Sequence, residues 1–411
     1  MKCQQQRLEN DFTELSKFGP LENGGFTRLA FSREDVAARG WLQKKMEDAG
    51  LEVRIDAFGN ISGRRKGLSA LPAVVMGSHL DTVPEGGNYD GAVGVLAGLE
   101  VIRTLNDNNL ETKRPIEVIN FSAEESSRFG MATMGSKALA GKFDLDTLNK
   151  LVDKNGTSLY QALKECGYAA DEIASVTIEP GQIHAFMEMH IEQGPVLEMQ
   201  GLPIGIVTSI AAPTRFKVSI EGRADHSGNT PMAIRKDALT GASELILGVE
   251  RIASKEAGEK TVGTIGYLYV TPGAMNVVPG KVELGIDIRD VNMGDKDKAV
   301  KAVIELMDAI AERRGLKISY QQLCNDEPVA LSDKIIKTLK DAADKLQLPS
   351  LIMPSGAGHD AMNMARLTDT GMIFIPSVGG ISHNIAELSN MADIYAGTEV
   401  LLQATLQLAQ E

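Results

Sequence analysis

The sequence predicts an α/β protein with a mixed, mostly parallel sheet that helices cover on both faces, plus an inserted ferredoxin-like α+β domain. Apolar strand patterns alternate with helical patterns up to Pro213, change there, and resume from Pro328. The length of 411 residues also exceeds the size at which a single hydrophobic core usually stops growing. We therefore expect one domain made of residues 1–212 and 328–411, and a second one made of residues 213–327.

The elements of the first part follow from local patterns. Residues 33–50 have the pattern of an amphipathic helix, with Gly50 at the position after the helix where glycine is favoured. Short β-rich or apolar runs predict strands, and small residues after Gly91 predict a closely packed helix. In chain order we expect strands at 52–56, 60–64 and 73–77, a helix at 91–105, and a strand at 116–121.

The inserted part has a different order of elements. An alternating strand at 215–221 precedes a long helix at 231–252, which Thr230 and Pro231 would open. Two strands at 261–270 and 281–287, a helix at 297–314 and a strand at 317–322 complete a βαββαβ module. The α/β pattern then returns with a helix at 332–346, a strand at 372–375 and a helix at 392–408.

Composition narrows the class of protein. The net charge of −13 argues against nucleic acid or an anionic membrane as a partner, because both attract basic surfaces. The sequence contains no stretch of eighteen consecutive apolar residues, so we expect no membrane span. The N-terminus lacks the apolar run of a secretory signal. The three cysteines are isolated from one another, which favours a reducing cytoplasm.

Acids and histidines gather where strands or glycine turns end. His79 and Asp81 follow the strand at 73–77, and their spacing puts both side chains on one face of an extended segment. Asp81 could then hold the imidazole of His79 from behind. Asp90 lies in a glycine-rich turn before the small-residue helix. Either motif alone is more typical of a surface pair or of an ordinary turn.

Further donors complete the set. Glu124 and Glu125 follow the strand at 116–121, at the end where open α/β sheets place their sites. Neighbours in an extended chain face opposite ways, so one glutamate can bind a metal while the other faces a water. With His190 and His383, three imidazoles and two carboxylates suit two divalent ions that share a carboxylate, such as zinc or manganese.

Specific motifs resemble the M20 family of dinuclear metallohydrolases, and within it the hydantoinase/carbamoylase group. This group includes N-carbamoyl-L-amino acid hydrolases, β-ureidopropionases and allantoate amidohydrolases. The resemblance extends from Gly24 to Glu387 and rests on the segments GSHLDTV, GGNYDG, AEESSRF, MHIEQGPVLE, HSGNTPM, NVVPG, SGAGHDA and GISHN. Ser126 and Ser127 stand where many carbamoylases have a glycine and a small residue.

The resemblance implies a role for each matching residue. One ion would be bound by His79, Asp90 and His190, and the other by Asp90, Glu125 and His383, with Asp90 as the bridge. Asp81 would orient His79, and Glu124 would be the general base. The ions would be zinc or manganese, with cobalt or nickel as further possibilities. The inserted domain would act as a lid and would mediate a homodimer.

Substrate contacts are also implied. His226 would stabilise the oxyanion, and the substrate-binding residues would be Gln193, Asn276, Arg289, Gly358 and His359. Arg289 would hold the substrate carboxylate, for which an arginine fork is suited. From the residues alone, Arg289 could equally pair with Asp287 or Asp290, Asn276 could be a turn residue, and His226 an ordinary surface histidine.

The expected reaction is hydrolysis of the terminal ureido group of an N-carbamoyl-L-amino acid. Glu124 would take a proton from the attacking water and return it to the leaving nitrogen, giving ammonia, carbon dioxide and the amino acid. Allantoate is the alternative substrate, because SGAGHDA and the segment around GISHN resemble allantoate amidohydrolases equally well. A dipeptidase is a further alternative. A non-catalytic binding protein would be expected to have lost ligands or the base, and none is lost here.

Overall fold

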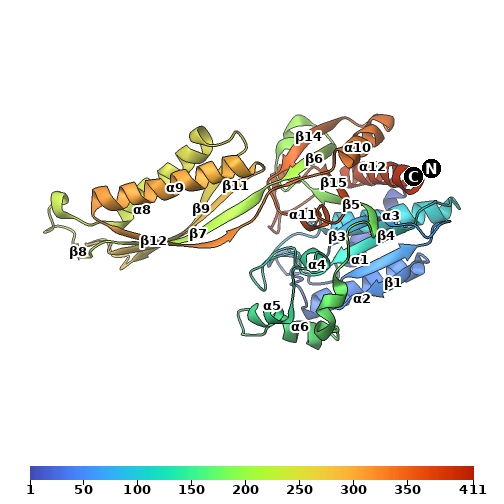
Figure 1. Ribbon diagram of the computed structural model, residues 1–411, viewed down its shortest axis with the longest axis horizontal. Helices are drawn as coiled ribbons and strands as arrows, with labels where there is room; N and C mark the ends of the chain where they lie inside the picture. The colour runs from blue at the N-terminus through green and yellow to red at the C-terminus, as the bar shows by residue number, and fades with distance from the viewer. The chain divides into compact units, whose positions relative to one another are not determined.

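Buried aliphatic runs form the centre of a nine-stranded sheet in the computed structural model, which describes residues 1–411 (Figure 1). The strand order is β1-β2-β4-β3-β5-β15-β6-β13, and β14 pairs with β6. Strands β4, β3, β5 and β15 run parallel, whereas β1 and β2 on one side and β6 on the other pair antiparallel. The chain therefore has the mixed α/β architecture that its sequence predicts.

The chain divides into two units, Met1–Thr208 with Ala330–Glu411, and Ser209–Val329. We call them unit 1 and unit 2. The helices of unit 1 are α1 (Gln5–Leu15), α2 (Arg33–Asp48), α3 (Ala92–Asp107), α4 (Met134–Leu139), α5 (Leu145–Lys150), α6 (Leu159–Glu165), η1 (Ala170–Val176), α7 (Val196–Gln200), α10 (Asp333–Lys345), α11 (Ala361–Met364), η4 (Val378–Gly380) and α12 (Met391–Ala409). The strands of its sheet are β1 (Glu52–Ile55), β2 (Ile61–Arg65), β3 (Ala73–His79), β4 (Ile116–Phe121), β5 (Ile183–Ile191), β6 (Ile204–Ile210), β13 (Val329–Ala330), β14 (Ser350–Ser355) and β15 (Asp369–Ile375), of which β6 and β13 cross the boundary between the units.

Helix α3 is packed directly on the parallel strands. It contacts β3, β4 and β5, and its small residues allow this approach. A Cβ added to Gly94 would lie 2.4 Å from the backbone oxygen of Met189, so a larger residue would push α3 away from the sheet. Helices α10 and α12 add to the same core, while α4 and α11 contact the sheet at β4 and β5. None of the helices is both long enough and apolar enough to cross a bilayer.

Unit 2 has a four-stranded antiparallel sheet in the order β12-β7-β11-β9. Alternate apolar residues of its strands face α8 and α9, and together they form a separate core (Figure 1). The elements are β7 (Ala212–Glu221), β8 (Asp225–His226), η2 (Met232–Ile234), α8 (Ala238–Arg251), η3 (Ile252–Glu256), β9 (Val262–Thr271), β10 (Val277–Val278), β11 (Lys281–Asp290), α9 (Met293–Arg314) and β12 (Lys317–Asn325).

The prediction of a long helix from Pro231 is wrong in its start, because the helix begins later in the chain. Met232–Ile234 forms a short 3-10 turn, and α8 begins at Ala238. The cause is Asp237, whose side chain accepts the backbone N–H groups of Leu239 and Thr240 at 3.0 and 3.1 Å. An aspartate in this geometry is a strong N-cap and sets the first residue of the helix.

Candidate metal centre

The predicted metal-binding side chains lie at one edge of the unit 1 sheet. His79 is the last residue of β3, His190 lies near the end of β5, and His383 follows β15. Glu124 and Glu125 follow β4. Because β3, β4, β5 and β15 are parallel, the segments that follow them meet at the same edge of the sheet, where open α/β sheets carry their sites.

Asp90 lies at the centre of this group, directly before α3. Its Oδ1 is 3.5 Å from His79 Nε2 and 3.1 Å from His190 Nε2. All three side chains are buried. Gly91, the next residue, cannot easily be replaced, because it has φ +68° and a Cβ there would lie 2.4 Å from His79 Nε2. Gly91 thus lets the backbone pass directly against the imidazole.

The second oxygen of Asp90 faces a different pair of donors. Its Oδ2 lies 3.2 Å from His383 Nε2, which is in turn 3.1 Å from Glu125 Oε1. His79, Asp90 and His190 therefore form one group of convergent donors, and Asp90, Glu125 and His383 form another. Each group uses its own oxygen of Asp90, which is the arrangement that a bridging carboxylate requires.

The hydrogen bonds of the imidazoles test whether these residues fit a metal. The Nδ1 atoms of His79 and His190 lie 3.0 and 2.9 Å from the backbone oxygens of Asp81 and Ile191. A carbonyl only accepts, so Nδ1 carries the proton and the Nε2 of a neutral ring presents a lone pair. Both Nε2 atoms face Asp90 Oδ1, and that of His190 also accepts the N–H of Gly91 at 3.2 Å. A proton or a cation between the facing acceptors would relieve their repulsion. The donor set of imidazoles and carboxylates fits a divalent ion such as zinc.

A third group of convergent donors, Glu188, His190 and His359, fits a metal less well. The oxygens of Glu188 already accept the Ser78 hydroxyl at 2.7 Å and the N–H of Ala361 at 2.9 Å. His359 Nε2 lies 3.0 Å from the hydroxyl of Ser355. This group also shares His190 with the first group, so the two groups around Asp90 are the better pair of candidate ion sites.

The loop that carries Glu124 and Glu125 is held by Asp81. The Asp81 carboxylate accepts the N–H groups of Glu124 and Glu125 at 3.2 and 3.0 Å. Ala123, just before them, has a left-handed backbone with φ 54°. The contact between Asp81 and His79 differs from the one we expected. The hydrogen bond runs to the carbonyl of Asp81, and its carboxylate Oδ1 is 3.6 Å from His79 Nδ1.

Glu124 is the acid of this loop that is free to carry a proton. It is buried, belongs to neither donor group, and its Oε2 lies 3.8 Å from His79 Nε2. Burial raises the pKa of Glu124 well above its ordinary value, opposed by the charge of His79 and assisted by that of Glu125. A carboxyl group in such surroundings can both accept and return a proton.

Gln193 reaches the same centre. Its Nε2 donates to Asp90 Oδ2 at 2.6 Å and lies 3.4 Å from His383 Nε2, while its Oε1 is buried without a partner. Of the other expected pocket residues in unit 1, Gly358 is exposed, whereas His359 is buried with its ring 4.5 Å from that of His190. Burial and the charge of His190 lower the pKa of His359 well below its ordinary value.

The other expected substrate residues belong to unit 2. His226 and Asn276 are both exposed and lie beside the short pairing of β8 with β10, where Ser227 N–H donates to Asn276 O at 3.0 Å. His226 Nδ1 accepts the N–H groups of Gly228 and Asn229 at 3.1 and 3.2 Å. The neutral ring therefore carries its proton on Nε2, where it can donate to a ligand.

Arg289 is paired within unit 2. Its Nε and Nη2 donate to the two oxygens of Asp287 at 3.0 and 3.1 Å. The pairing of Arg289 with Asp287, which the sequence left open as an alternative, is thus present in this structure. Asp287 also accepts from Arg215 at 2.9 Å, so the two guanidinium groups share this carboxylate.

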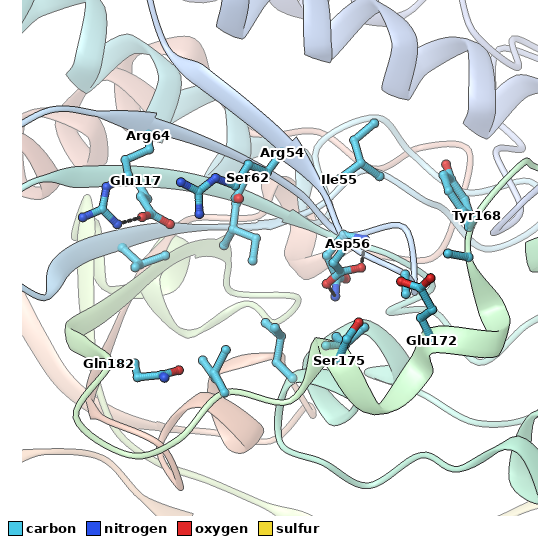
Figure 2. A pocket seen from close by; sticks show the side chains of 18 of the residues that line it. Arg54, Ile55, Asp56, Ser62, Arg64, Glu117, Tyr168, Glu172, Ser175 and Gln182 are labelled. Atoms are coloured by element: carbon cyan, nitrogen blue, oxygen red, sulfur yellow. Dashed lines mark hydrogen bonds and ion pairs between the residues drawn. The ribbon is translucent and has the colours of Figure 1, made fainter.

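A separate cavity of about 880 Å³ lies elsewhere in unit 1, and none of the predicted site residues lines it. Figure 2 shows its wall, where Arg64 and Glu117 form an ion pair and Asp56 receives hydrogen bonds from Asn60. Its other labelled polar residues include Tyr168, Ser175 and Gln182. Because Arg64 and Glu117 pair with each other, we assign no ligand to this cavity.

Sequence analysis missed three buried acids around the centre, namely Glu188, Asp360 and Glu387. Asp360 accepts from the Ser136 hydroxyl, and its second oxygen is buried without a partner. The signal was present, because all three lie inside or beside the motifs that carry the metal-binding histidines. Their burial could not be read from those motifs, since it depends on partners far away in the chain.

We expect the affinity for a metal ion to depend on pH, because the candidate histidine ligands hold protons that an ion would displace. Hydrogen bonds with Asp90 and Glu125 raise the pKa of His383 to about 11. Burial opposes the charged form of His79, but Asp90, Glu124 and Asp81 raise its pKa well above its ordinary value. These surroundings favour a proton on each ring, and a ligand must be deprotonated to bind an ion.

We therefore expect Zn²⁺ binding to release protons and to tighten as the pH rises from about 6 to about 9. Calorimetric titration of the metal-free chain in buffers of different ionisation enthalpy counts the released protons. An affinity that does not change with pH, or a heat that does not depend on the buffer, would contradict the assignment of these imidazoles as ligands.

The chain is similar to known proteins over most of its length. Residues 75–407 match the model of peptidase family M20/M25/M40. The chain is 43% identical over 401 residues to a ureidoglycolate hydrolase of Arabidopsis thaliana, covering 96% of the chain and 84% of the relative. It is 40% identical over 405 residues to an N-carbamoyl-L-amino-acid amidohydrolase of Pseudomonas sp. (strain NS671), covering 98% of each.

A solved structure is similar over the whole length. The chain superimposes on an amidase of the hydantoinase/carbamoylase family from Burkholderia multivorans with a TM-score of 0.94 and 38% identity, covering 100% of this chain and 99% of the other. Fold, donor groups and sequence identity lead to the same assignment. The chain belongs to peptidase family M20/M25/M40, among its amidohydrolases that act on C–N bonds other than peptide bonds.

Proposed function

We propose that the protein hydrolyses the terminal carbamoyl group of N-carbamoyl-L-amino acids, releasing ammonia, carbon dioxide and the amino acid. The observation that carries the proposal is the pair of donor groups that share Asp90, with the buried Glu124 beside them. The similarity to the Pseudomonas N-carbamoyl-L-amino-acid amidohydrolase over nearly the whole chain supports the choice of substrate.

The residues around the centre can divide the reaction between them. His79, Asp90 and His190 would hold one divalent ion, and Asp90, Glu125 and His383 the other. Ions bound there would lower the pKa of a neighbouring water and polarise a carbonyl. Glu124 takes the proton of the attacking water, whose oxygen adds to the carbamoyl carbon. The same carboxyl group then gives the proton to the leaving nitrogen, which departs as ammonia, and the carbamate that remains loses carbon dioxide.

Other side chains would bind the substrate. His226 is a suitable donor to the oxyanion, because its Nδ1 is occupied by two backbone N–H groups and its Nε2 carries the proton. Arg289, which Asp287 holds in place, is proposed to bind the substrate carboxylate, for which its planar guanidinium group is suited. Asn276, Gly358, His359 and Gln193 are proposed as further contacts. The identity of the ions as zinc or manganese, and a homodimer formed through unit 2, belong to this proposal and rest on the motif resemblance.

A second candidate substrate is another ureido acid, allantoate. The segments SGAGHDA and GISHN resemble allantoate amidohydrolases as closely as carbamoylases. The 43% identity to a ureidoglycolate hydrolase also favours a ureido acid of this kind. Both candidates share a terminal carbamoyl nitrogen and a carboxylate, so the same centre serves either.

A panel of substrates separates the candidates. The protein loaded with Zn²⁺ or Mn²⁺ is assayed for ammonia release from N-carbamoyl-L-amino acids, N-carbamoyl-β-alanine, allantoate and ureidoglycolate, and for cleavage of a dipeptide. We expect the highest kcat/KM with an N-carbamoyl-L-amino acid. A higher kcat/KM with allantoate would select the second candidate. Dipeptide cleavage without ammonia release from any ureido acid would overturn both, and so would the absence of all activity.

Replacing Glu124 by glutamine should lower kcat by about 10²–10⁴-fold, because the amide cannot accept the proton of water. Glu124 belongs to neither donor group, so the variant should still bind two ions per chain by elemental analysis. Asp144→Asn, at an exposed helix cap, is a control that should keep the wild-type rate. Turnover by Glu124→Gln at the wild-type rate would show that another group is the base.

A further inference from the structure

Glu387 is a buried acid outside the donor groups, and hydrogen-bond donors surround its carboxylate. Its Oε1 accepts the N–H groups of Tyr89 and Asp90, both at 3.1 Å. Its Oε2 accepts the Ser382 hydroxyl at 3.0 Å and the N–H of His383 at 3.3 Å. The residue is only 6% exposed. A carboxylate is an acceptor at both oxygens, so it can satisfy all these donors together.

These contacts join two loops that carry metal-binding residues. One loop leads to Asp90, the other carries His383, and Asp90 and Glu387 are 297 residues apart in sequence. The first loop comes close to Glu387, since a Cβ on Gly87 would lie 2.2 Å from its Oε1. A side chain at that position would therefore displace the carboxylate. The distance between Asp90 and His383 thus depends on a hydrogen-bonded link and not on the local chain.

Ser382 strengthens the link. Its hydroxyl lies 3.0 Å from Asp90 Oδ2 and 3.0 Å from Glu387 Oε2. A hydroxyl has one proton to donate, so the two carboxylates compete for it. When cations are bound at its oxygens, Asp90 competes less for the hydroxyl proton of Ser382. The hydroxyl can then donate to Glu387. The hydrogen bond from Ser382 to Glu387 should therefore be strongest in the metal-bound protein.

We propose that Glu387 is a positioning residue that holds His383 against Asp90 and thereby sets the affinity for the ion bound by Asp90, Glu125 and His383. The proposal rests on the metal assignment within the proposed function, but not on the identity of the substrate. Groups that orient metal ligands through hydrogen bonds commonly change metal affinity by about 10–100-fold. The group of His79 and His190 has no contact with Glu387 except through Asp90.

The substitution Glu387→Gln tests the need for a carboxylate. The amide keeps the size of the side chain, but its NH₂ group would face N–H donors on one side or the other. A suitable control is Glu399→Gln, because Glu399 is another buried acid of unit 1, 5% exposed, that accepts a backbone N–H, from Cys3 at 2.5 Å. Glu399 lies on α12 and touches neither metal-binding loop.

The metal-free full-length chains are titrated with Zn²⁺ in competition with a chelator, and circular dichroism verifies that they are folded. Wild type and Glu399→Gln should bind two ions with the same affinities. Glu387→Gln should bind the ion at Asp90, Glu125 and His383 about 10–100-fold more weakly. The other ion should be affected less, because only the shared Asp90 links its donor group to Glu387. If Glu387→Gln does not fold, Ser382→Ala is titrated instead. It should lower the affinity for the same ion, the one at Asp90, Glu125 and His383.

Three results would overturn the proposal. If Glu387→Gln binds two ions with wild-type affinity, Glu387 has no positioning role. If Glu387→Gln does not fold, wild-type affinity of Ser382→Ala for both ions leads to the same conclusion. An equal loss in Glu399→Gln would mean that the effect is a general loss of stability. A wild-type chain that binds fewer than two ions would remove the basis of the proposal. A wild-type chain that binds two ions but releases no ammonia from any ureido acid would contradict only the substrate assignment.

Discussion

The structure around the candidate centre depends on one constraint, the burial of several carboxylates in a small volume. Asp81, Asp90, Glu124 and Glu125 are 2%, 6%, 7% and 8% exposed. Burying an ionised carboxylate is costly unless positive charge and hydrogen bonds compensate it. The chain supplies three imidazoles, the backbone N–H groups that Asp81 accepts, and the charge of the buried Arg39 near Asp81. Divalent cations at the two donor groups would complete the balance, which explains why so many acids are tolerated together.

The parallel sheet makes this concentration of charge possible. It brings the ends of β3, β4, β5 and β15 to one edge, so that residues from all parts of unit 1 converge without long side chains. Each loop that carries candidate ligands is then held by an acid that lies outside the two donor groups around Asp90. Asp81 holds the loop of Glu124 and Glu125, and Glu387 holds the loops of Asp90 and His383. Rigid positioning of this kind keeps donor atoms close although their charges repel.

Patterns that are local in sequence were predicted well, and contacts between distant residues were not. The expected strands at 73–77 and 116–121 and the helix at 91–105 correspond to β3, β4 and α3. Strand β5 was not predicted, because Glu188 and His190 interrupt its apolar pattern and are buried only through partners elsewhere in the chain. The pairing of Arg289 with Asp287 and the role of Glu387 are likewise decided by tertiary contacts. Most candidate ligands could be found because they lie just after a predicted strand or beside a glycine turn, whereas His190 was found through the motif MHIEQGPVLE.

The central claim is that two ions share Asp90, and anomalous X-ray diffraction from crystals of the zinc-loaded protein tests it most directly. The account predicts two peaks, one on each side of the Asp90 carboxylate, with ligand distances of about 2.0–2.2 Å. One peak should lie against His79 and His190, and the other against Glu125 and His383. A single peak, or a peak among Glu188, His190 and His359, would contradict the account.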